Sequence, residues 1–299
     1  MSFNPLVSVI INCYNSEKFL KYTIESVLLQ KYKNFEIIFW DNKSTDNSYS
    51  IAKSFEDNRI KLFKSSEHQK LYAARNCALN EAKGDFIAFV DSDDIWLKDK
   101  LLIQMEDFKN EEIGFSFTNV IIKNENSLNF IKNSKSLSGG YIFKKLLKKY
   151  YVPFSSLILR KSMLNKFNLK FDDNFDYLGD IDLILRISYY CKASVIQKPL
   201  IIYRIHNSNL SLINKDQQTA EYSYLLKKLR NIDIFKSNQN FKFFQYKVFY
   251  IKILNEKLKG NFKQSLKYLF QYKTGISKLK LILIIFTPIF ILKKIKLYL

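Results

Sequence analysis

Glycine is scarce in this chain: there are seven in 299 residues, and the first of them is Gly84. The P-loop, the dinucleotide-binding fingerprint and the entry loop of sugar nucleotidyltransferases all need a cluster of glycines directly after the first strand. The scarcity of glycine therefore excludes these three kinds of phosphate-binding loop from the part of the chain before Gly84.

Cysteine and histidine are also few. The three cysteines and two histidines are scattered along the chain: Cys13, Cys77, Cys191, His68 and His206. This pattern excludes a zinc cage and a disulfide framework. Free thiols fit a reducing compartment, so we expect a cytoplasmic protein.

Long apolar runs are missing as well. A membrane-spanning helix needs about 20 apolar residues, and the apolar runs near the two ends of the chain are far shorter. Residues 6–11 are too short for a secretory signal and lack its basic start, so we predict a buried strand there. Residues 281–291 are uncharged and are followed by Lys293, Lys294 and Lys296. Two interpretations remain open: an element at a membrane interface with snorkelling lysines, or a buried C-terminal helix.

The chain is rich in apolar and basic residues. Hydrophobic residues make up 47% of it and aromatic residues 16%, which suffices for a large core and excludes disorder. Of the net charge of +20, residues 216–299 carry +13, because they contain 17 basic and 4 acidic residues. A basic tail indicates an anionic partner, either membrane lipid or nucleic acid. The alternative is that the bulk charge reflects the lysine-rich composition of an AT-rich genome.

Strand and helix patterns alternate in the first part of the chain. We predict strands at residues 6–11, 35–40, 59–63 and 86–90, and helices at residues 16–30, from 44–46 onward and at 71–82. This alternation predicts an α/β fold with a mainly parallel sheet and helices on both faces.

Beyond Trp96 the pattern is mixed, and from residue 216 it is helical only. We predict a helix at residues 180–191 and strands at residues 114–122, 154–159, 194–197 and 200–205. The chain is therefore predicted to consist of a domain of residues 1–215 and a basic helical region of residues 216–299, with a possible membrane-interface segment at 276–299.

Polar residues follow three of the predicted strands, at residues 12–15, 41–42 and 91–94. The carboxyl ends of parallel strands meet at one edge of the sheet, where ligands bind. The four carboxylates there repel one another unless a cation neutralises them; they are Asp41, Asp91, Asp93 and Asp94. Oxygen ligands favour Mg²⁺ or Mn²⁺. The alternative is a solvated acidic turn, which the matching motifs on neighbouring strands disfavour.

A second acidic signal opens the helix predicted at residues 180–191. Asp180 shares a helix face with Leu183 and Ile187, so it points inward and is a candidate proton acceptor. The alternative is an N-cap carboxylate. Asp182 lies four residues before Arg186, which predicts an ion pair at the surface or rim.

His206 follows the last predicted strand. A lone histidine is more often structural than a ligand. Near an acidic metal site, it is a candidate third ligand or phosphate contact.

The chain resembles family 2 glycosyltransferases in six motifs that occur in the family's order. They are residues 7–15 (VSVIINCYN), 41–46 (DNKSTD), 74–76 (ARN), 84–86 (GDF), 91–94 (DSDD) and 179–183 (GDIDL). The resemblance covers about residues 6–210. It implies a GT-A fold, an inverting reaction, a nucleotide-diphosphate sugar donor (here a UDP-sugar) and Mn²⁺ or Mg²⁺.

The resemblance also assigns donor-binding roles by position. Tyr14 would stack on the base, and Asp41 would accept the imide hydrogen of that base. Arg75 would lie near the phosphates and Asp91 at the ribose. The donor-binding set also includes Asn12, Asn15 and Ser92.

The remaining roles concern the chemistry. Asp180 would be the general base, Asp93 would bind the metal, and His206 would lie near the metal or the pyrophosphate. The chain also departs from the family at three places. Asn12 replaces the usual Pro, residues 42–43 are Asn-Lys instead of Asp-Gly, and Gly179 replaces the frequent Glu before the base.

The resemblance implies a hexosyltransferase or N-acetylhexosaminyltransferase of surface polysaccharide synthesis (capsule, O-antigen or lipooligosaccharide). The expected acceptor is a glycan or a polyprenyl-linked glycan. We expect the basic tail to hold the enzyme on the inner face of the cell membrane, and we expect no nucleic-acid partner. The loops at residues 124–138 and 150–156 are expected to select the substrates. The alternative is a non-catalytic basic protein with a degenerate site that binds membranes or nucleic acid.

Overall fold

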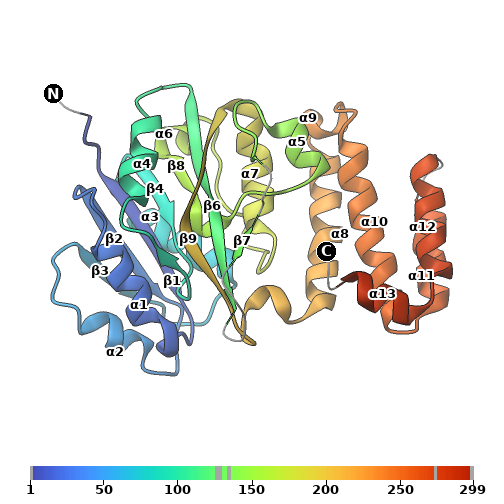
Figure 1. Cartoon of the computed structure of the whole chain (residues 1–299), viewed down its shortest axis with the longest axis horizontal. Helices are drawn as coiled ribbons and strands as arrows, with labels where there is room; N and C mark the ends of the chain where they lie inside the picture. The colour runs from blue at the N-terminus through green and yellow to red at the C-terminus, as the bar shows by residue number, and fades with distance from the viewer. Residues whose placement is uncertain (1–2, 125–129, 133–135, 273–274, 297–299) are drawn as a thin grey trace. The chain divides into compact units, whose positions relative to one another are not determined.

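The computed structural model describes residues 3–124, 130–132, 136–272 and 275–296 (Figure 1). The chain divides into two compact units. Unit 1 comprises Met1–Leu146 and Tyr150–Asn209, and unit 2 comprises Leu147–Lys149 and Leu210–Leu299.

Unit 1 contains a nine-stranded sheet with the order β3-β2-β1-β4-β8-β6-β9-β5, in which β7 pairs with β6 (Figure 1). Its first four strands are parallel and alternate along the chain with helices. These elements are β1 (Val7–Cys13), α1 (Glu17–Leu28), β2 (Phe35–Asp41), α2 (Ser48–Lys53), β3 (Ile60–Lys64), α3 (Leu71–Glu81) and β4 (Phe86–Phe89). The predicted α/β fold is thus confirmed.

Strand β1 is buried on both faces, as expected for a central strand covered by helices. Val7, Val9 and Ile11 belong to one apolar cluster with side chains of α1. Ser8 and Ile10 alternate with them and are also buried, and α3 contacts β1. Each such apolar side chain contributes roughly 1.5–3 kcal/mol to folding. Burial therefore fixes the strand's position and the edge at which it ends.

The second part of the sheet pairs antiparallel, except for the long strands β6 and β9, which run parallel (Figure 1). Its strands are β5 (Ile95–Trp96), β6 (Ile113–Asn124), β7 (Phe130–Lys132), β8 (Ile158–Arg160) and β9 (Lys192–Ile205). The other helices that begin in unit 1 are α4 (Lys100–Asp107), α5 (Phe143–Lys148), α6 (Lys161–Lys166) and α7 (Gly179–Tyr190).

Two predicted elements differ from the structure. The two short strands expected around Pro199 form the single strand β9, because a register shift between Thr118–Ile196 and Asn119–Pro199 accommodates the proline as an irregularity in the ladder. Residues 154–156, expected to begin a strand, form the 3₁₀ helix η1 (Phe154–Ser156). There the Ser156 hydroxyl donates to the Pro153 carbonyl, a local bond that competes with strand pairing.

The described residues of unit 2 form helices and the turns that connect them. It contains η2 (Leu210–Leu212), α8 (Lys215–Arg230), α9 (Asp233–Lys236), α10 (Phe241–Leu258), α11 (Phe262–Gln271), α12 (Ile276–Phe286) and α13 (Ile289–Lys296). Helix α10 packs against α8, α11, α12 and α13. Among the described residues, no helix combines the length and the apolar character needed to cross a membrane.

Candidate functional site

Strands β1, β2 and β4 bring three of the predicted site segments to one edge of the sheet. The last residues of β1 and β2, Cys13 and Asp41, lie opposite each other, and β4 pairs with β1 on its other side. The loops after β1 and β2 are tied together, because the Thr45 backbone N–H donates to Asn15 Oδ1 at 2.8 Å. Asn15 therefore joins these two loops.

Asp41 and Asn12 carry buried polar atoms at this edge. Asp41 is fully buried, and its Oδ1 accepts a hydrogen bond from the Ser44 N–H at 3.2 Å. Its Oδ2 has no hydrogen-bond partner among the described residues, and neither has the side-chain amide of Asn12. An unpaired buried polar atom costs free energy, so both side chains are suited to bind a polar ligand.

Tyr14 lies beside these groups with 47% of its surface exposed. Its ring packs against His68, with 4.1 Å between the ring centroids. His68 Nδ1 lies 3.1 Å from the Asn42 carbonyl oxygen. His68 lies outside every motif of the sequence, and no role was predicted for it.

Arg75 and Asp91 form an ion pair deeper in the site. The Arg75 guanidinium is nearly fully buried and lies 4.0 Å from the centre of the Phe154 ring, within the range of a cation–π contact. The Ser155 hydroxyl contacts the carboxylates of both Asp91 and Asp94. Asp94 is fully buried, and burial raises its pKa well above the usual value.

Asp93 is held from the other side by the segment that follows β9. His206 Nε2 lies 2.9 Å from Asp93 Oδ2, and the Asn209 amide donates to the same oxygen at 3.1 Å. Burial, and then the negative charge of Asp91, raise the pKa of Asp93. Asp93 and His206 were both predicted near the metal from the sequence, whereas Asn209, three residues after His206, was not.

The donor atoms of Asp93 and His206 fit a divalent cation that has few protein ligands. No group of three or more His, Cys, Asp or Glu side chains in the described part of the chain is arranged to hold a metal ion. A cation at these two residues would therefore need further ligands, which a bound diphosphate and water would supply. Such sharing is common for Mg²⁺ at nucleotide sites.

Ser92 lies in the turn between these carboxylates and is buried. Its hydroxyl is 2.7 Å from the Ser16 hydroxyl, and its carbonyl accepts a hydrogen bond from Thr23. These contacts fix the acidic turn against the N-cap and the middle of α1.

Asp180 lies in the first turn of α7 and is mostly buried. Tyr72 donates to its Oδ1 at 3.0 Å, and Tyr150 donates to its Oδ2 at 3.2 Å. Burial raises the pKa of Asp180, while the two tyrosine hydroxyls and the charge of Arg75 oppose that rise. Neither tyrosine was singled out from the sequence.

Asp182 corrects one expectation. Its ion pair with Arg186 is present at 2.6 Å, but the Asp182 side chain is fully buried instead of lying at the surface. Arg186 also donates to the Lys170 carbonyl at 2.7 Å, so this pair links α7 to the preceding loop.

A cavity of about 200 Å³ adjoins the acidic turn. It is lined by Asp91, Asp94, Val120, Pro153, Phe154, Ser155, Ile201 and Tyr203. Part of the first loop expected to select substrates, residues 125–129 and 133–135, lies outside the described residues.

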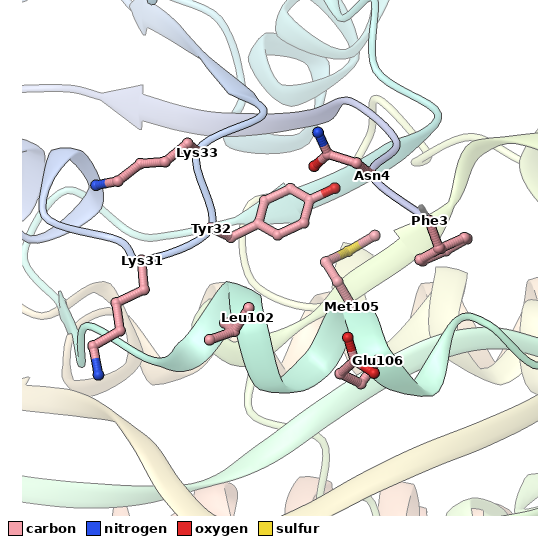
Figure 2. Close-up of a pocket in the computed structure, with 8 residues that line it drawn as sticks. All are labelled: Phe3, Asn4, Lys31, Tyr32, Lys33, Leu102, Met105 and Glu106. Atoms are coloured by element: carbon pink, nitrogen blue, oxygen red, sulfur yellow. The ribbon is translucent and has the colours of Figure 1, made fainter. Parts of the chain in front are cut away.

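A second cavity, of about 290 Å³, is shown in Figure 2. Its lining residues Phe3 and Asn4 precede β1, and Lys31, Tyr32 and Lys33 precede β2. It therefore lies at the amino ends of the parallel strands, whereas ligands of open α/β sheets bind at the carboxyl ends. We place the functional site at the acidic turn.

Comparison with known proteins gives matches over most of the chain. A model of the family described as "Glycosyl transferase family 2" matches residues 8–168. The Escherichia coli UDP-Glc:alpha-D-GlcNAc-diphosphoundecaprenol beta-1,3-glucosyltransferase WfaP is 32% identical over 224 residues, which cover 75% of this chain and 86% of that protein. WfgD from Escherichia coli, which has the same enzyme name, is 37% identical over 174 residues, covering 58% and 67%.

Solved structures show the same fold at low sequence identity. TarS residues 1–349 from S. aureus, in complex with UDP-GlcNAc, aligns with a TM-score of 0.64 and 17% identity, covering 88% of this chain and 80% of that chain. The mannosyltransferase PcManGT from Pyrobaculum calidifontis, in complex with GDP-Man and Mn²⁺, aligns with a TM-score of 0.60 and 14% identity, covering 94% and 79%.

Proposed function

The chain belongs to glycosyl transferase family 2, and we propose that it transfers a hexose or N-acetylhexosamine from a UDP-sugar to a hydroxyl group of a polyprenyl-linked glycan. The setting is the synthesis of a surface polysaccharide, such as capsule, O-antigen or lipooligosaccharide. WfaP is named for UDP-glucose and a GlcNAc-diphosphoundecaprenol, so these are the first donor and acceptor to test.

This proposal rests on a series of contacts that links the proposed base, Asp180, to the donor-binding residues Arg75 and Asp91. The Tyr72 hydroxyl donates to Asp180, and the Arg75 guanidinium lies 4.7 Å from the centre of the Tyr72 ring. Arg75 in turn pairs with Asp91. The carboxylates of α7 and of the turn after β4 thus converge on one basic residue.

In the proposed mechanism, Asp180 accepts the proton of the acceptor hydroxyl as that oxygen attacks the anomeric carbon. The raised pKa of Asp180 makes it a stronger base than an exposed aspartate, while its hydrogen bonds keep the carboxylate available. A single displacement needs one base and no carboxylate nucleophile, unlike the two-step route of retaining glycosidases. We therefore propose inversion at the anomeric carbon.

The donor is held by groups at the strand ends. Tyr14 stacks on the base and Asp41 accepts the imide hydrogen with its unpaired Oδ2. Arg75 attracts the diphosphate, and Asp91 binds the ribose. Asn12 contributes its unpaired amide, while Asn15 and Ser92 hold the loops around the donor.

The residues that would bind a divalent cation are Asp93 and His206. When bound, Mn²⁺ or Mg²⁺ would neutralise charge on the departing nucleoside diphosphate. Asn209 keeps the Asp93 carboxylate oriented by donating to its Oδ2.

The stereochemistry of the product tests the single displacement. With α-linked UDP-glucose and a GlcNAc-diphospholipid acceptor, we expect a β-linked product, measured from the anomeric coupling constant by NMR. An α-linked product would contradict the role of Asp180 as a base in one displacement. A screen of other UDP-sugars under the same conditions would identify the donor.

The C-terminal helices carry a surface that fits a membrane. Six apolar side chains on α11, α12 and α13 are exposed, with exposed fractions of 38% to 75%: Phe270, Leu279, Leu283, Phe286, Phe290 and Ile291. Leu279, Leu283 and Phe286 follow helical spacing and share one face of α12. Exposed Lys280 lies on the same helix. Apolar side chains with neighbouring lysines suit the interface of an anionic membrane. We therefore propose peripheral attachment to the inner face of the cell membrane.

The double substitution Leu283→Glu with Phe286→Glu is expected to lower binding to anionic phospholipid vesicles by at least about tenfold. The reason is that each apolar side chain buried in the membrane interface contributes roughly 1.5–3 kcal/mol to binding. Vesicle sedimentation measures the bound fraction. The matched control is Leu29→Glu, at an exposed leucine of unit 1, which should bind like the wild type.

Removal of residues 276–299 should also release the protein from vesicles while leaving donor hydrolysis intact. Undiminished sedimentation of the truncated protein would refute membrane attachment through this segment.

A further inference from the structure

The start of α7 is unusual because it contains a glycine whose space is filled by a side chain from another helix. A Cβ atom at Gly179 would lie 2.4 to 2.6 Å from three carbon atoms of the Tyr72 ring. Real Cβ atoms essentially never approach other atoms so closely. The Tyr72 ring therefore excludes every side chain at position 179, including the Glu that is frequent there in the family signature.

Tyr72 is itself held rigidly. It lies in the first turn of α3 with only 3% of its surface exposed. Its ring packs on Phe171, with 5.1 Å between centroids, and its other contacts include the guanidinium of Arg75. A ring confined in this way cannot turn its hydroxyl to another partner. That hydroxyl donates to Asp180 Oδ1 at 3.0 Å.

The second oxygen of Asp180 has a different kind of partner. Tyr150 donates to Oδ2 at the longer distance of 3.2 Å and is more exposed than Tyr72. Oδ1 thus accepts a hydrogen bond from a buried tyrosine, whereas Oδ2 accepts one from a more exposed tyrosine. Of the two carboxylate oxygens, Oδ2 therefore has the partner with the longer hydrogen bond and the more exposed side chain.

We propose that Tyr72 is a positioning residue for the transfer reaction: it holds Asp180 through Oδ1 so that Oδ2 faces the acceptor hydroxyl, and Gly179 is required to make room for it. This inference rests on the proposed role of Asp180 as general base. It adds a coupled pair of residues, one on α3 and one on α7, on which the geometry of the base depends.

The Tyr72→Phe variant separates the hydroxyl from the ring. It keeps the ring packing and the contact with Arg75, and it removes only the hydrogen bond to Asp180. We expect kcat near neutral pH to fall about tenfold, the size of one hydrogen bond to a charged group, with the donor KM unchanged. Tyr32→Phe is the matched control, because Tyr32 is a buried tyrosine whose hydroxyl donates to the Pro5 carbonyl at the other edge of the sheet.

The pH profile distinguishes positioning from a general loss of structure. The groups facing Asp180 are Tyr72 and Arg75 of α3, Tyr150, and the backbone N–H of Ile181, and all of them favour the charged carboxylate. Removing the Tyr72 hydroxyl removes one of these, so the pKa of Asp180 rises. The acid limb of kcat against pH should therefore move to higher pH in Tyr72→Phe and stay in place in Tyr32→Phe.

A second pair of variants tests the space at position 179. Gly179→Ala should lower both Tm and kcat, because the new methyl group overlaps the Tyr72 ring. In a Tyr72→Ala background the same Gly179→Ala change should have little further effect on Tm. An equal loss of Tm in both backgrounds would refute the coupling between the two residues.

The outcomes separate this inference from the proposed function. If Asp180→Asn is inactive while Tyr72→Phe matches the wild type in kcat and in its acid limb, Tyr72 has no positioning role and the proposed base stands. If Asp180→Asn remains active, the proposed base itself is wrong. A shifted acid limb and lowered kcat in Tyr72→Phe, with an unchanged donor KM, supports both.

Discussion

The Asp180→Asn variant is expected to transfer sugar at least about 100-fold more slowly than the wild type, the usual size of a lost general base. Asparagine keeps the shape and accepts the Tyr72 hydrogen bond, but it takes no proton from the acceptor. The Tm should be equal to or higher than that of the wild type at pH 7. Burial raises the pKa of Asp180 in the folded state, which means that the folded state favours the uncharged form of this side chain. A neutral asparagine therefore avoids the free-energy cost of a buried charge. Steady-state transfer and a thermal melt measure the two effects.

Asp182→Asn is the matched control, two residues further along the same helix. Asp182 is fully buried and pairs with Arg186 at 2.6 Å. Breaking a buried ion pair from one side costs about 3–5 kcal/mol, so this variant should lose stability while the folded fraction keeps its turnover. If Asp180→Asn turned over at near the wild-type rate, the assignment of the base to Asp180 would be wrong.

The Asp93→Ala variant is expected to lose at least about 100-fold in kcat/KM, and most of its response to added Mn²⁺. The substitution removes the carboxylate that His206 and Asn209 both contact, and with it one of the two proposed cation ligands. Nucleoside diphosphate release measured against Mn²⁺ concentration should show a weakened or absent metal response. His206→Ala should show the same direction with a smaller effect, because Asp93 remains.

Asp85→Asn serves as the control for this experiment. Asp85 is exposed and directly precedes β4, whereas Asp93 follows the opposite end of the same strand. The control should keep the wild-type rate and the wild-type metal response. An Asp93→Ala enzyme with an unchanged Mn²⁺ response would show that the cation, if one is used, binds elsewhere.

Much of the site's location follows from the sequence, because strand ends in a parallel sheet are predictable from apolar runs. The runs that became β1, β2 and β4 determine where Asn12, Asp41 and Asp91 emerge, and their pairing brings these residues to one edge. The helical spacing around Asp180 likewise indicated an inward-facing carboxylate, and the structure shows it mostly buried with two hydrogen-bond donors.

The partners of these carboxylates were not predictable in the same way. Tyr72 and Tyr150 are 108 and 30 residues away from Asp180, and no periodicity connects them to it. Asp182 is a different case, because its spacing to Arg186 predicted the ion pair but not the burial of the Asp182 side chain or the bond from Arg186 to the Lys170 carbonyl. Contacts that arise only from tertiary packing leave little trace in one sequence. Pro199 is a similar case, since the register shift that accommodates it depends on β6.

Release of nucleoside diphosphate by the wild-type chain is the most direct test of the proposed active site. The assay supplies UDP-glucose and a GlcNAc-diphospholipid, once with Mn²⁺ and once with EDTA, alongside Asp180→Asn. We expect rapid UDP release with Mn²⁺, and at least about 100-fold less with EDTA or in the variant. Equal release by the variant and the wild type, or wild-type turnover that EDTA leaves untouched, would contradict an active site built from the Asp180 base and the Asp93 cation site.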